Sequence, residues 1–245
     1  MSQVSLTRLQ MFYGGLDALP LLRVILREEF PAHTALISSF GADAALMLSL
    51  VAEIEPSTPV LFLETQKHFP ETLDYARTLT ATLGLTNVHW LTPDPEMTSR
   101  IDPNGELWKT QPNRCCWLRK VEPLNRAVEQ LGLKALITGR KRYQTSERAE
   151  MQTIELDDQG IFRINPLALW DKERQKQEIA ARGLPEHPLV ARGYPSIGCA
   201  PCTAPVAAGQ DERAGRWAHT IGIENEQKTE CGIHLSSEEI TNWSV

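Results

Sequence analysis

Short apolar runs recur along the chain and alternate with longer segments in which apolar residues have helical spacing. The short runs predict strands at residues 34–38, 58–63, 88–91 and 134–138. Near-continuous apolar runs of this kind are typical of parallel strands that are covered on both faces. The helical spacing predicts helices over residues 1–30, 44–54 and 70–83. The pattern therefore favours an α/β protein.

The sequence predicts a hairpin, a helix and a turn-rich segment in the C-terminal half of the chain. Asp157-Asp158-Gln159-Gly160 separates the apolar runs 151–156 and 161–164, which is a hairpin signal. Asp171 is placed to cap a helix that continues to Ala181. From Gly183 onward, frequent proline and glycine indicate extended chain with turns. The polar residues 221–245 are expected to be mobile except where Cys231 docks.

The turn after the first predicted strand has two interpretations. Ser39-Phe40-Gly41-Ala42-Asp43 leads from the strand directly into an apolar helix. A strand, a turn of small residues and a helix can point backbone N–H groups and the helix dipole at an anion. In the alternative, Gly41 only allows the turn and Asp43 caps the helix. The spacing leaves both interpretations open.

Polar residues also follow two other predicted strands. Gly139-Arg140-Lys141-Arg142 begins a basic run that extends to Arg148 directly after the strand at 134–138. Such a run is usually a solvated face, but in this place its guanidinium groups could clamp phosphate or sulfate. His68 follows the strand at 58–63. It is expected to be a solvated loop histidine in preference to a ligand or a base.

Composition narrows the classes of function. The chain has 245 residues, 42% of them hydrophobic, and a net charge of −6, which argues against a broadly basic nucleic-acid binder. Local basic clusters in an acidic protein suit a small anionic ligand better. The longest mostly apolar run, 44–52, is less than half of the about 20 residues that a membrane span needs. No secretory pattern is visible at the N-terminus, so we expect a cytoplasmic protein without a membrane partner.

Four of the five cysteines stand in two pairs. Cys115 and Cys116 are adjacent and cannot easily bridge each other, because neighbouring Cα atoms lie about 3.8 Å apart and a disulfide prefers roughly 5.5–6 Å. Cys199 and Cys202 have the Cys-x-x-Cys spacing of metal-binding loops. A zinc site, an iron–sulfur cluster and unrelated buried thiols all compete. The vicinal pair, expected to open an amphipathic helix after an irregular segment at 101–113, fits zinc poorly and suits different irons of one cluster.

Cys231 stands apart from the two pairs. Gly232 gives access to its backbone and His234 lies nearby, so it is a candidate nucleophile, with an incidental tail cysteine as the alternative. A thiolate near neutral pH needs a positive neighbourhood. The basic clusters would supply one if the tail closed over a bound anion.

These motifs, in this order, resemble the adenylyl/phosphoadenylyl-sulfate reductase family, and in particular its assimilatory members. The resemblance runs from about Ser38 to His234. Its markers are Ser38-Ser39-Phe40-Gly41, Phe69-Pro70-Glu71-Thr72, Cys115-Cys116 with Arg119-Lys120, Gly139-Arg140 through Arg148, Gly193 to Cys199 with Cys202, and Glu230-Cys231-Gly232. The chain departs from the usual pattern at Glu64-Thr65-Gln66, where similar proteins show Asp-Thr-Gly, and at Ala42-Asp43-Ala44, where an acidic pair is more usual.

The resemblance implies an open, mostly parallel α/β sheet of the adenine-nucleotide α-hydrolase (PP-loop-like) type. It places a nucleotide-binding reductase domain with an iron–sulfur site at residues 1–220 and a mobile C-terminal tail with the nucleophile at 221–245. It further implies a [4Fe–4S] cluster on Cys115, Cys116, Cys199 and Cys202.

The implied reaction is reduction of adenosine 5′-phosphosulfate to sulfite and AMP in assimilatory sulfate reduction. Cys231 would carry an S-sulfocysteine intermediate, and thioredoxin or a similar thiol donor would release sulfite. Lys120 could reach both the cluster edge and the substrate sulfate. The candidate substrate-binding residues are Ser39, Phe40, Gly41, Thr65, Arg119, Gly139, Arg140, Arg142, Arg148, Arg213, Arg216 and His234.

Other functions remain as alternatives. Members of the family that lack the cysteine pairs resemble reductases of the 3′-phosphorylated substrate, so that activity is the first alternative. An ATP-pyrophosphatase of similar fold would want Ser-Gly-Gly-x-Asp-Ser, and the turn at 39–44 lacks its first glycine and final serine. A non-catalytic iron–sulfur sensor or a zinc-stabilised module would not need Cys231. A homo-oligomer stays open.

Overall fold

The structure is a computed structural model and describes residues 5–220, 228, 230–234, 237–240 and 243. Its strands are β1 (Thr34–Ser38), β2 (Val60–Leu63), β3 (Val88–Leu91), β4 (Ala135–Ile137), β5 (Ile154–Leu156) and β6 (Phe162–Ile164). Its α-helices are α1 (Leu6–Tyr13), α2 (Ala18–Val24), α3 (Ala44–Ile54), α4 (Pro70–Thr82), α5 (Pro95–Ile101), α6 (Leu107–Thr110), α7 (Pro112–Cys116), α8 (Glu122–Gln130), α9 (Lys172–Ala181) and α10 (Ser237–Ile240).

The described strands form one sheet in the order β3-β2-β1-β4-β6-β5. Every neighbouring pair is parallel except β5 with β6, which is the antiparallel hairpin that the turn at 157–160 predicts. The mostly parallel α/β sheet expected from the sequence is therefore confirmed. Asp171 caps α9 as predicted, because its carboxylate accepts from the Arg174 N–H.

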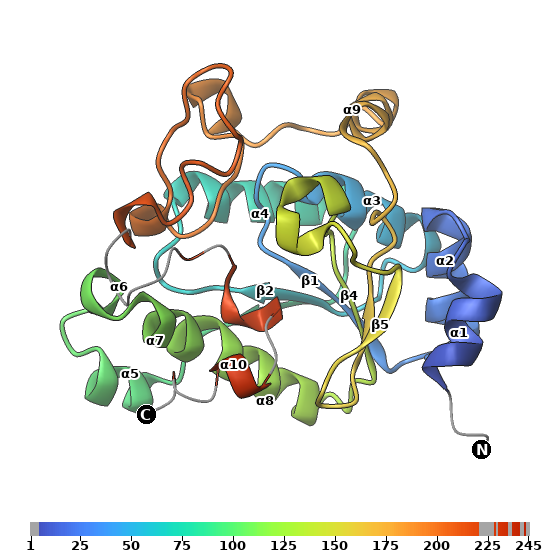
Figure 1. The fold of residues 1–245 in the computed structure, drawn as a ribbon, viewed down its shortest axis with the longest axis horizontal. Coiled ribbons are helices and arrows are strands. Elements are labelled where there is room, and N and C mark those ends of the chain that lie inside the picture. The colour runs from blue at the N-terminus through green and yellow to red at the C-terminus, as the bar shows by residue number, and fades with distance from the viewer. Residues whose placement is uncertain (1–4, 221–227, 229, 235–236, 241–242, 244–245) are drawn as a thin grey trace.

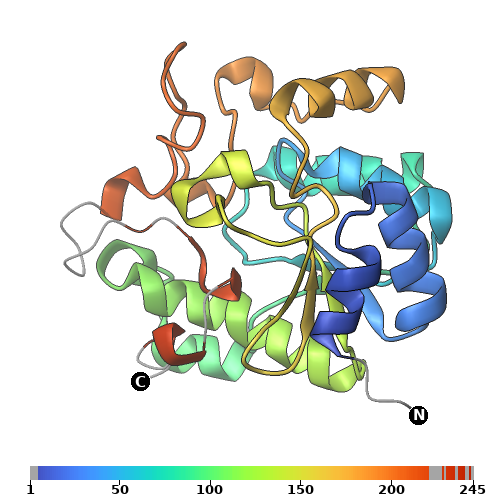
Figure 2. The same cartoon turned by 45° about the vertical axis from the view of Figure 1, so that its right-hand side comes forward.

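Helices cover both faces of the sheet, as Figures 1 and 2 show. On one face, α1–α4 pack on alternate strand residues such as Leu36 and Phe62. On the other, α8 packs on the residues between them, such as Ile37 and Leu61. Because side chains alternate along a strand, both sets must be apolar, which explains the continuous apolar runs.

The strand order creates a topological switch point between β1 and β4. The chain leaves β1 for β2 and β3 on one side, then crosses back through α5–α8 to β4 on the other side. Connections that diverge in this way leave a crevice at the carboxyl ends of the two strands, where open α/β sheets bind ligands. The segments after β1 and β4 are the turn 39–43 and the basic run 139–148.

Two predictions about local structure are wrong. Residues 101–113 are not irregular throughout, since they contain α6 and the start of α7. The vicinal cysteines also end α7 instead of opening a helix. Pro112 occupies the first turn of α7, where its missing N–H costs nothing, so the helical run begins before the cysteines. It continues through a π-helical turn, Trp117–Val121, into α8.

The turn-rich segment after α9 is fixed to α4 by buried polar contacts. The His187 ring is fully buried, lies 3.0 Å from the Thr72 hydroxyl and accepts from the Leu189 N–H. The Tyr75 hydroxyl donates to the Pro185 carbonyl. These contacts hold the extended segment against the N-terminal half of α4. In the part of the chain that is described, no helix is long and apolar enough to cross a bilayer.

The C-terminal tail contributes a few described residues to the same region. Gly232–His234 form a 3-10 turn that packs against the π-helical turn Trp117–Val121. The expected mobility of residues 221–245 concerns positions that lie largely outside the described residues.

Candidate active site

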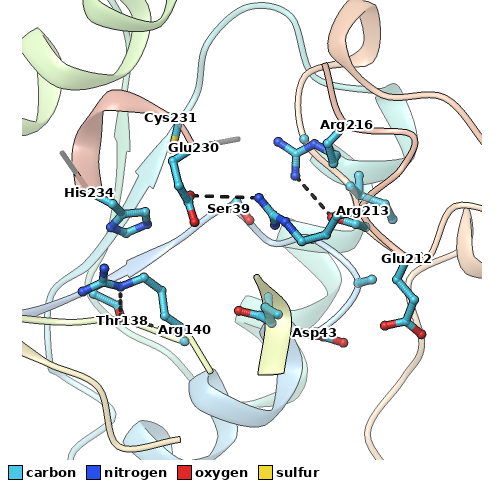
Figure 3. A pocket seen from close by; sticks show the side chains of 18 of the residues that line it. Ser39, Asp43, Thr138, Arg140, Glu212, Arg213, Arg216, Glu230, Cys231 and His234 are labelled. Carbon is cyan, nitrogen blue, oxygen red and sulfur yellow. Dashed lines mark hydrogen bonds and ion pairs between the residues drawn. The ribbon is translucent and has the colours of Figure 1, made fainter. Parts of the chain in front are cut away.

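A cavity of about 470 Å³ opens at the switch point between β1 and β4. Its walls come from the turns after these two strands, from residues 195–198 and 210–217, and from the tail residues 230–234. Figure 3 shows tail and loop side chains pointing toward one another across this space. Segments remote in sequence thus meet where an α/β sheet binds ligands.

The cavity is rich in cations. Its lining includes Lys120, Arg140, Arg148, Arg213 and Arg216. Guanidinium groups bind phosphate and sulfate through paired N–H donors, and a partly buried site strengthens each interaction. The arrangement therefore fits a small ligand with several negative oxygens.

Arg140 is held in place by the polar residues at the ends of β4 and β6. Its side chain donates to the Thr138 hydroxyl and to the Asn165 carbonyl oxygen, 3.3 and 3.2 Å away. Asn165 is fully buried and also accepts from Thr138 at 2.6 Å. Its amide donates to Glu155, which forms an ion pair with Arg140. A guanidinium fixed on several sides is pre-organised for an anion.

Arg213 and Arg216 come from the loop that crosses above the sheet. Burial, followed by the charges of Arg216 and Arg148, lowers the pKa of Arg213 to about 10, so it stays cationic at neutral pH. The Arg216 guanidinium lies 4.4 Å from the Trp217 ring centroid. It also lies against Gly198, where a Cβ would come within 2.7 Å of its Cζ atom. The glycine before Cys199 therefore makes room for Arg216.

Cys231 reaches the cavity from the tail. Its neighbour Gly232 packs so closely on the π-helical turn that an added Cβ would come within 2.9 Å of Val121. The sulfur is partly exposed and also packs against the region of Cys199 and Cys202. The tail thus brings a free thiol beside the basic cavity.

Lys120 lies between the paired cysteines and Cys231. Burial alone would lower the pKa of its ammonium group, but the negative charges of Cys199, Cys116 and Cys231 outweigh burial and raise it. Lys120 therefore stays protonated where a thiolate and an anionic ligand would meet.

Two histidines at the cavity are neutral. Burial, followed by the charges of four arginines, lowers the pKa of His234 well below its usual value. Burial, together with Lys120 and Arg216, lowers the pKa of His68 to about 4. The His68 ring lies 2.9 Å from the Leu63 carbonyl and packs on Phe62. The prediction of a solvated loop histidine is wrong, because the strand end folds the ring inward.

The turn after β1 presents two of its residues to the cavity. Ser39 and Gly41 line the cavity, whereas Phe40 adopts a positive φ of 47° and is fully buried on Phe62. Asp43 precedes α3 but its side chain does not cap the helix. It forms an ion pair with Lys141 at 3.0 Å, and the Lys141 ammonium is buried. The capping role considered for Asp43 is therefore wrong.

All four paired cysteines are buried and free, and the charges of the two pairs act on one another. The Thr65 hydroxyl lies 3.3 Å from Cys199 Sγ. Burial, reinforced by the neighbouring cysteines, raises the pKa of Cys115 and of Cys202 to about 12. Thiols of this kind are neutral and unreactive on their own, but a bound cation ionises them.

The spacing of the cysteines bears on the kind of metal centre. Among the described residues, no group of three or more cysteine, histidine or acidic side chains could hold a single metal ion. Thiolates around one zinc stand only about 4 Å apart, given a Zn–S bond of about 2.3 Å. A cubane separates its ligands further because each binds a different iron. The two buried pairs, which influence one another's charge, are the sulfur donors available to a metal centre.

Some residues predicted to bind substrate do not line the cavity. Arg119 is 3% exposed, pairs with Asp102 at 2.7 Å and donates to the Thr65 carbonyl. Arg142 donates to the Met151 carbonyl at 2.7 Å. Phe40 and Thr65 are also buried beneath the site. The cavity does gather Ser39, Gly41, Lys120, Gly139, Arg140, Arg148, Arg213, Arg216, Cys231 and His234.

Sequence reasoning missed two supporting residues. Asn165 follows β6 and orients Arg140. A polar residue directly after a strand of a parallel sheet is a sequence feature that could have identified it. That signal was lost because the segment was assigned only to a hairpin. Lys141 is 1% exposed beneath the turn after β1, where the basic run had suggested either a solvated face or an anion clamp.

Comparison with known proteins settles the family. The sequence profile of the phosphoadenosine phosphosulfate reductase domain matches residues 33–205. The chain belongs to this family. The matched span contains β1, β4 and both cysteine pairs, whereas Arg213, Arg216 and Cys231 lie beyond it.

Individual relatives agree with this assignment. An "Adenosine 5'-phosphosulfate reductase" of Mesorhizobium japonicum is 47% identical over 233 residues, covering 95% of this chain and 88% of the relative. A phosphoadenylyl-sulfate reductase from Candida auris, solved as a phosphate complex, is 27% identical with a TM-score of 0.69, covering 82% of this chain and 98% of that one. A Candida glabrata FMN adenylyltransferase shares the fold, at 14% identity and a TM-score of 0.55, over 92% of this chain and 80% of that chain.

Proposed function

We propose that this protein reduces adenosine 5′-phosphosulfate to sulfite and AMP, with Cys231 as nucleophile. One observation carries the proposal: a free thiol, Cys231, stands beside Lys120 in a cavity lined by four arginines. The name of the 47% identical relative supports the sulfonucleotide as substrate. A thiol surrounded by anion-binding groups fits attack on sulfur within a sulfate.

The first step is transfer of the sulfo group to the protein. The Cys231 thiolate attacks the substrate sulfur, the bond from sulfur to the bridging phosphate oxygen breaks, and AMP leaves with the electron pair. Lys120 and the cavity arginines other than Arg148 hold the negative charge that grows on AMP. The product on the protein is S-sulfocysteine. Sulfur transfer to Cys231 requires no other electron donor at this stage.

The second step regenerates the thiol. A thiolate of reduced thioredoxin, or of a similar dithiol donor, attacks Cys231 Sγ and expels sulfite with the electron pair of the S–S bond. The donor's second thiol then opens the mixed disulfide, so the donor ends as a disulfide and Cys231 as a thiolate. The two electrons therefore come from the thiol donor, which also favours the cytoplasm as the compartment.

We infer that Cys115, Cys116, Cys199 and Cys202 hold a [4Fe–4S] cluster. When bound, the cluster would connect α7 to the loop of Cys199. It would contribute to the local electrostatic field without changing its oxidation state. Thr65 would donate to a ligand sulfur, and Lys120 would counter the negative charge of the thiolates. The substrate's nucleotide end would lie toward Ser39, Gly41 and Gly139, at the switch point.

Residues 1–220 would then form the reductase body and residues 221–245 the tail that supplies the nucleophile. The lining of the cavity supports this division, because it combines the turns after β1 and β4 with the tail residues 230–234. The tail also has to expose Cys231 to the thiol donor in the second step.

Sulfite release by anaerobically purified protein tests the proposal. Reduced thioredoxin is supplied with either adenosine 5′-phosphosulfate or its 3′-phosphorylated analogue at equal concentration. We expect strong preference for the unphosphorylated substrate, and equal or reversed rates would instead support the phosphoadenylyl-sulfate reductase named for the 27% identical structure. Cys231→Ser should keep its iron and lose all turnover. Sulfite from that variant would contradict the nucleophile, and none from intact wild type would favour a sensor.

A further inference from the structure

The residue before the nucleophile is a buried carboxylate in a cavity built for anions. Glu230 is 9% exposed, and its two oxygens accept from Arg148 Nε at 2.5 Å and from the second Arg148 nitrogen at 2.8 Å. Arg213 approaches the same carboxylate at 4.0 Å. Figure 3 shows Glu230 pointing toward Arg213 beside Cys231. The contact between Glu230 and Arg148 is a fork-to-fork ion pair, the strongest geometry between these groups.

All three guanidinium nitrogens of Arg148 have protein acceptors. Glu230 uses two of its guanidinium nitrogens, and the third donates to the Gln144 side chain. The Arg148 residue is 7% exposed and sits in the short 3-10 turn Ser146–Arg148. Unlike Arg140 and Arg216, Arg148 has a protein acceptor on each of its three guanidinium nitrogens while Glu230 is paired, which leaves only the second N–H of each terminal nitrogen for a phosphate or sulfate oxygen.

The pair connects the tail to the body of the protein at the residue next to the thiol. Gly232, on the other side of Cys231, is packed on Val121 of the turn that carries Lys120. Cys231 is therefore held from both sides, by an ion pair at residue 230 and by packing at residue 232. Loss of either support would let the sulfur leave the line of attack.

We propose that Arg148 and Glu230 form a positioning pair that fixes Cys231 over the cavity, and that Arg148 does not bind the substrate. The proposal rests on the nucleophilic role of Cys231 given above. Neither residue touches the reacting atoms. Their effect is to raise the fraction of molecules in which the thiolate faces the substrate sulfur.

Two single variants and their double variant test this idea. Glu230→Gln and Arg148→Gln should each slow S-sulfocysteine formation about 10- to 100-fold, because misplacing a reacting group by about 1 Å costs roughly 100-fold. The rate is measured in a single turnover without thioredoxin. The equilibrium Kd of AMP should change less than about twofold, and the iron content should match wild type. Glu238→Gln, an exposed glutamate of the same tail, is the control.

The double variant separates a pair from two independent residues. Removing one partner leaves the other charge buried and uncompensated, whereas removing both removes that penalty. The double variant, Glu230→Gln with Arg148→Gln, should therefore form S-sulfocysteine at least as fast as the slower of the two single variants. The proposal would be overturned if the rate losses of the two single variants multiplied in the double variant. It would also be overturned if Arg148→Gln alone weakened the affinity for AMP.

Hydrogen exchange keeps the test independent of activity. The amides of residues 230–234 should exchange faster in each single variant than in wild type or Glu238→Gln, with no substrate present. Unchanged exchange would overturn the positioning pair even if turnover fell. If wild type forms no S-sulfocysteine, the proposed function fails, and the exchange result still decides whether the pair anchors the tail.

Discussion

At the scale of single residues, Gly198 shows how a backbone position sets the place of a charged group. The Arg216 guanidinium lies where a Cβ on residue 198 would be. The atoms in conflict are at the free end of a flexible side chain, so arginine and not the backbone would move. Gly198 therefore serves the site more than it serves the fold.

Gly198→Ala should weaken substrate binding without unfolding the protein. A hydrogen bond to a charged group contributes about 1.5–3 kcal/mol, so displacing Arg216 should raise KM roughly 10- to 100-fold. The melting temperature should stay the same or rise slightly, because alanine restricts the unfolded chain. Steady-state kinetics and thermal unfolding measure the two effects.

Gly15→Ala is the matched control, since nothing lies within 4 Å of an added Cβ there. It should leave KM unchanged. A Gly198→Ala enzyme with normal KM would show that Arg216 does not meet the substrate. A large fall in melting temperature would instead assign Gly198 to packing.

Residue types predicted the chemistry of the site better than they predicted which residue performs it. Cys231 was identified as the cysteine that stands apart from the two pairs, and Lys120 by its place one helical turn after Cys116, and the fold brings both to the cavity. Arg119 was expected beside the substrate, yet it pairs with Asp102, a residue 17 positions earlier. Local sequence cannot show such a partner, because the ion pair exists only after the π-helical turn Trp117–Val121 docks on the end of α5.

At the scale of elements, helices and parallel strands were predictable and helix register was not. The bounds of β1 and α3 match their apolar runs, since these elements bury nearly every residue. The π-helical turn Trp117–Val121 left no mark in the spacing. A π turn inserts a residue and rotates the helix beyond it, so it changes how Lys120 faces relative to the cysteines.

The segment that follows α9 should loosen in acid because of His187. One ring nitrogen accepts the Leu189 N–H, which only the neutral ring can do, and the other nitrogen then carries the ring proton beside Thr72. Burial, opposed only by Glu71, lowers the pKa of His187 to about 4, below the unfolded value of about 6.5. The stabilisation is complete above about pH 6.5 and is lost as the pH falls toward 4, because the unfolded chain binds the proton first.

Denaturant unfolding from pH 4 to 7 measures this effect. The free energy of unfolding should rise with pH in wild type. The slope of that rise reports how many protons are taken up on unfolding, and this number should be smaller in His187→Gln by up to one. The comparison uses slopes, so a constant loss of stability in the variant does not matter. Identical slopes would mean that His187 does not titrate between the folded and unfolded states.

At the scale of the whole molecule, an acidic chain concentrates its cations at one crevice. The net charge is −6, yet the cavity between β1 and β4 is lined by Lys120 and four arginines. The apolar pattern identified the strands and helices, and the strand order that brings segments 39–43, 139–148 and 230–234 together required the structure. Long-range placement of loops depends on packing that no local pattern records.

The two cysteine pairs join parts of the molecule that are far apart in sequence. Cys115 and Cys116 belong to the helical run on one face of the sheet, and Cys199 and Cys202 to the loop fixed to α4 on the other. A cluster held by both pairs would therefore act as a crosslink between the two layers around the cavity. We expect anaerobically purified protein to contain about four irons per chain.

Removing the metal should then weaken the whole assembly, because metal-binding free energy becomes folding free energy when only the folded state presents the ligands. Oxidation followed by chelation should lower the melting temperature and increase hydrogen exchange at residues 112–121 and 195–203 together. Thr65→Val, which removes only the hydroxyl near Cys199 Sγ, should keep the iron and the coupled protection. An increase in hydrogen exchange confined to one of the two segments would contradict a cluster that spans both pairs. A single zinc per chain would contradict it as well, and the two pairs would then have separate roles.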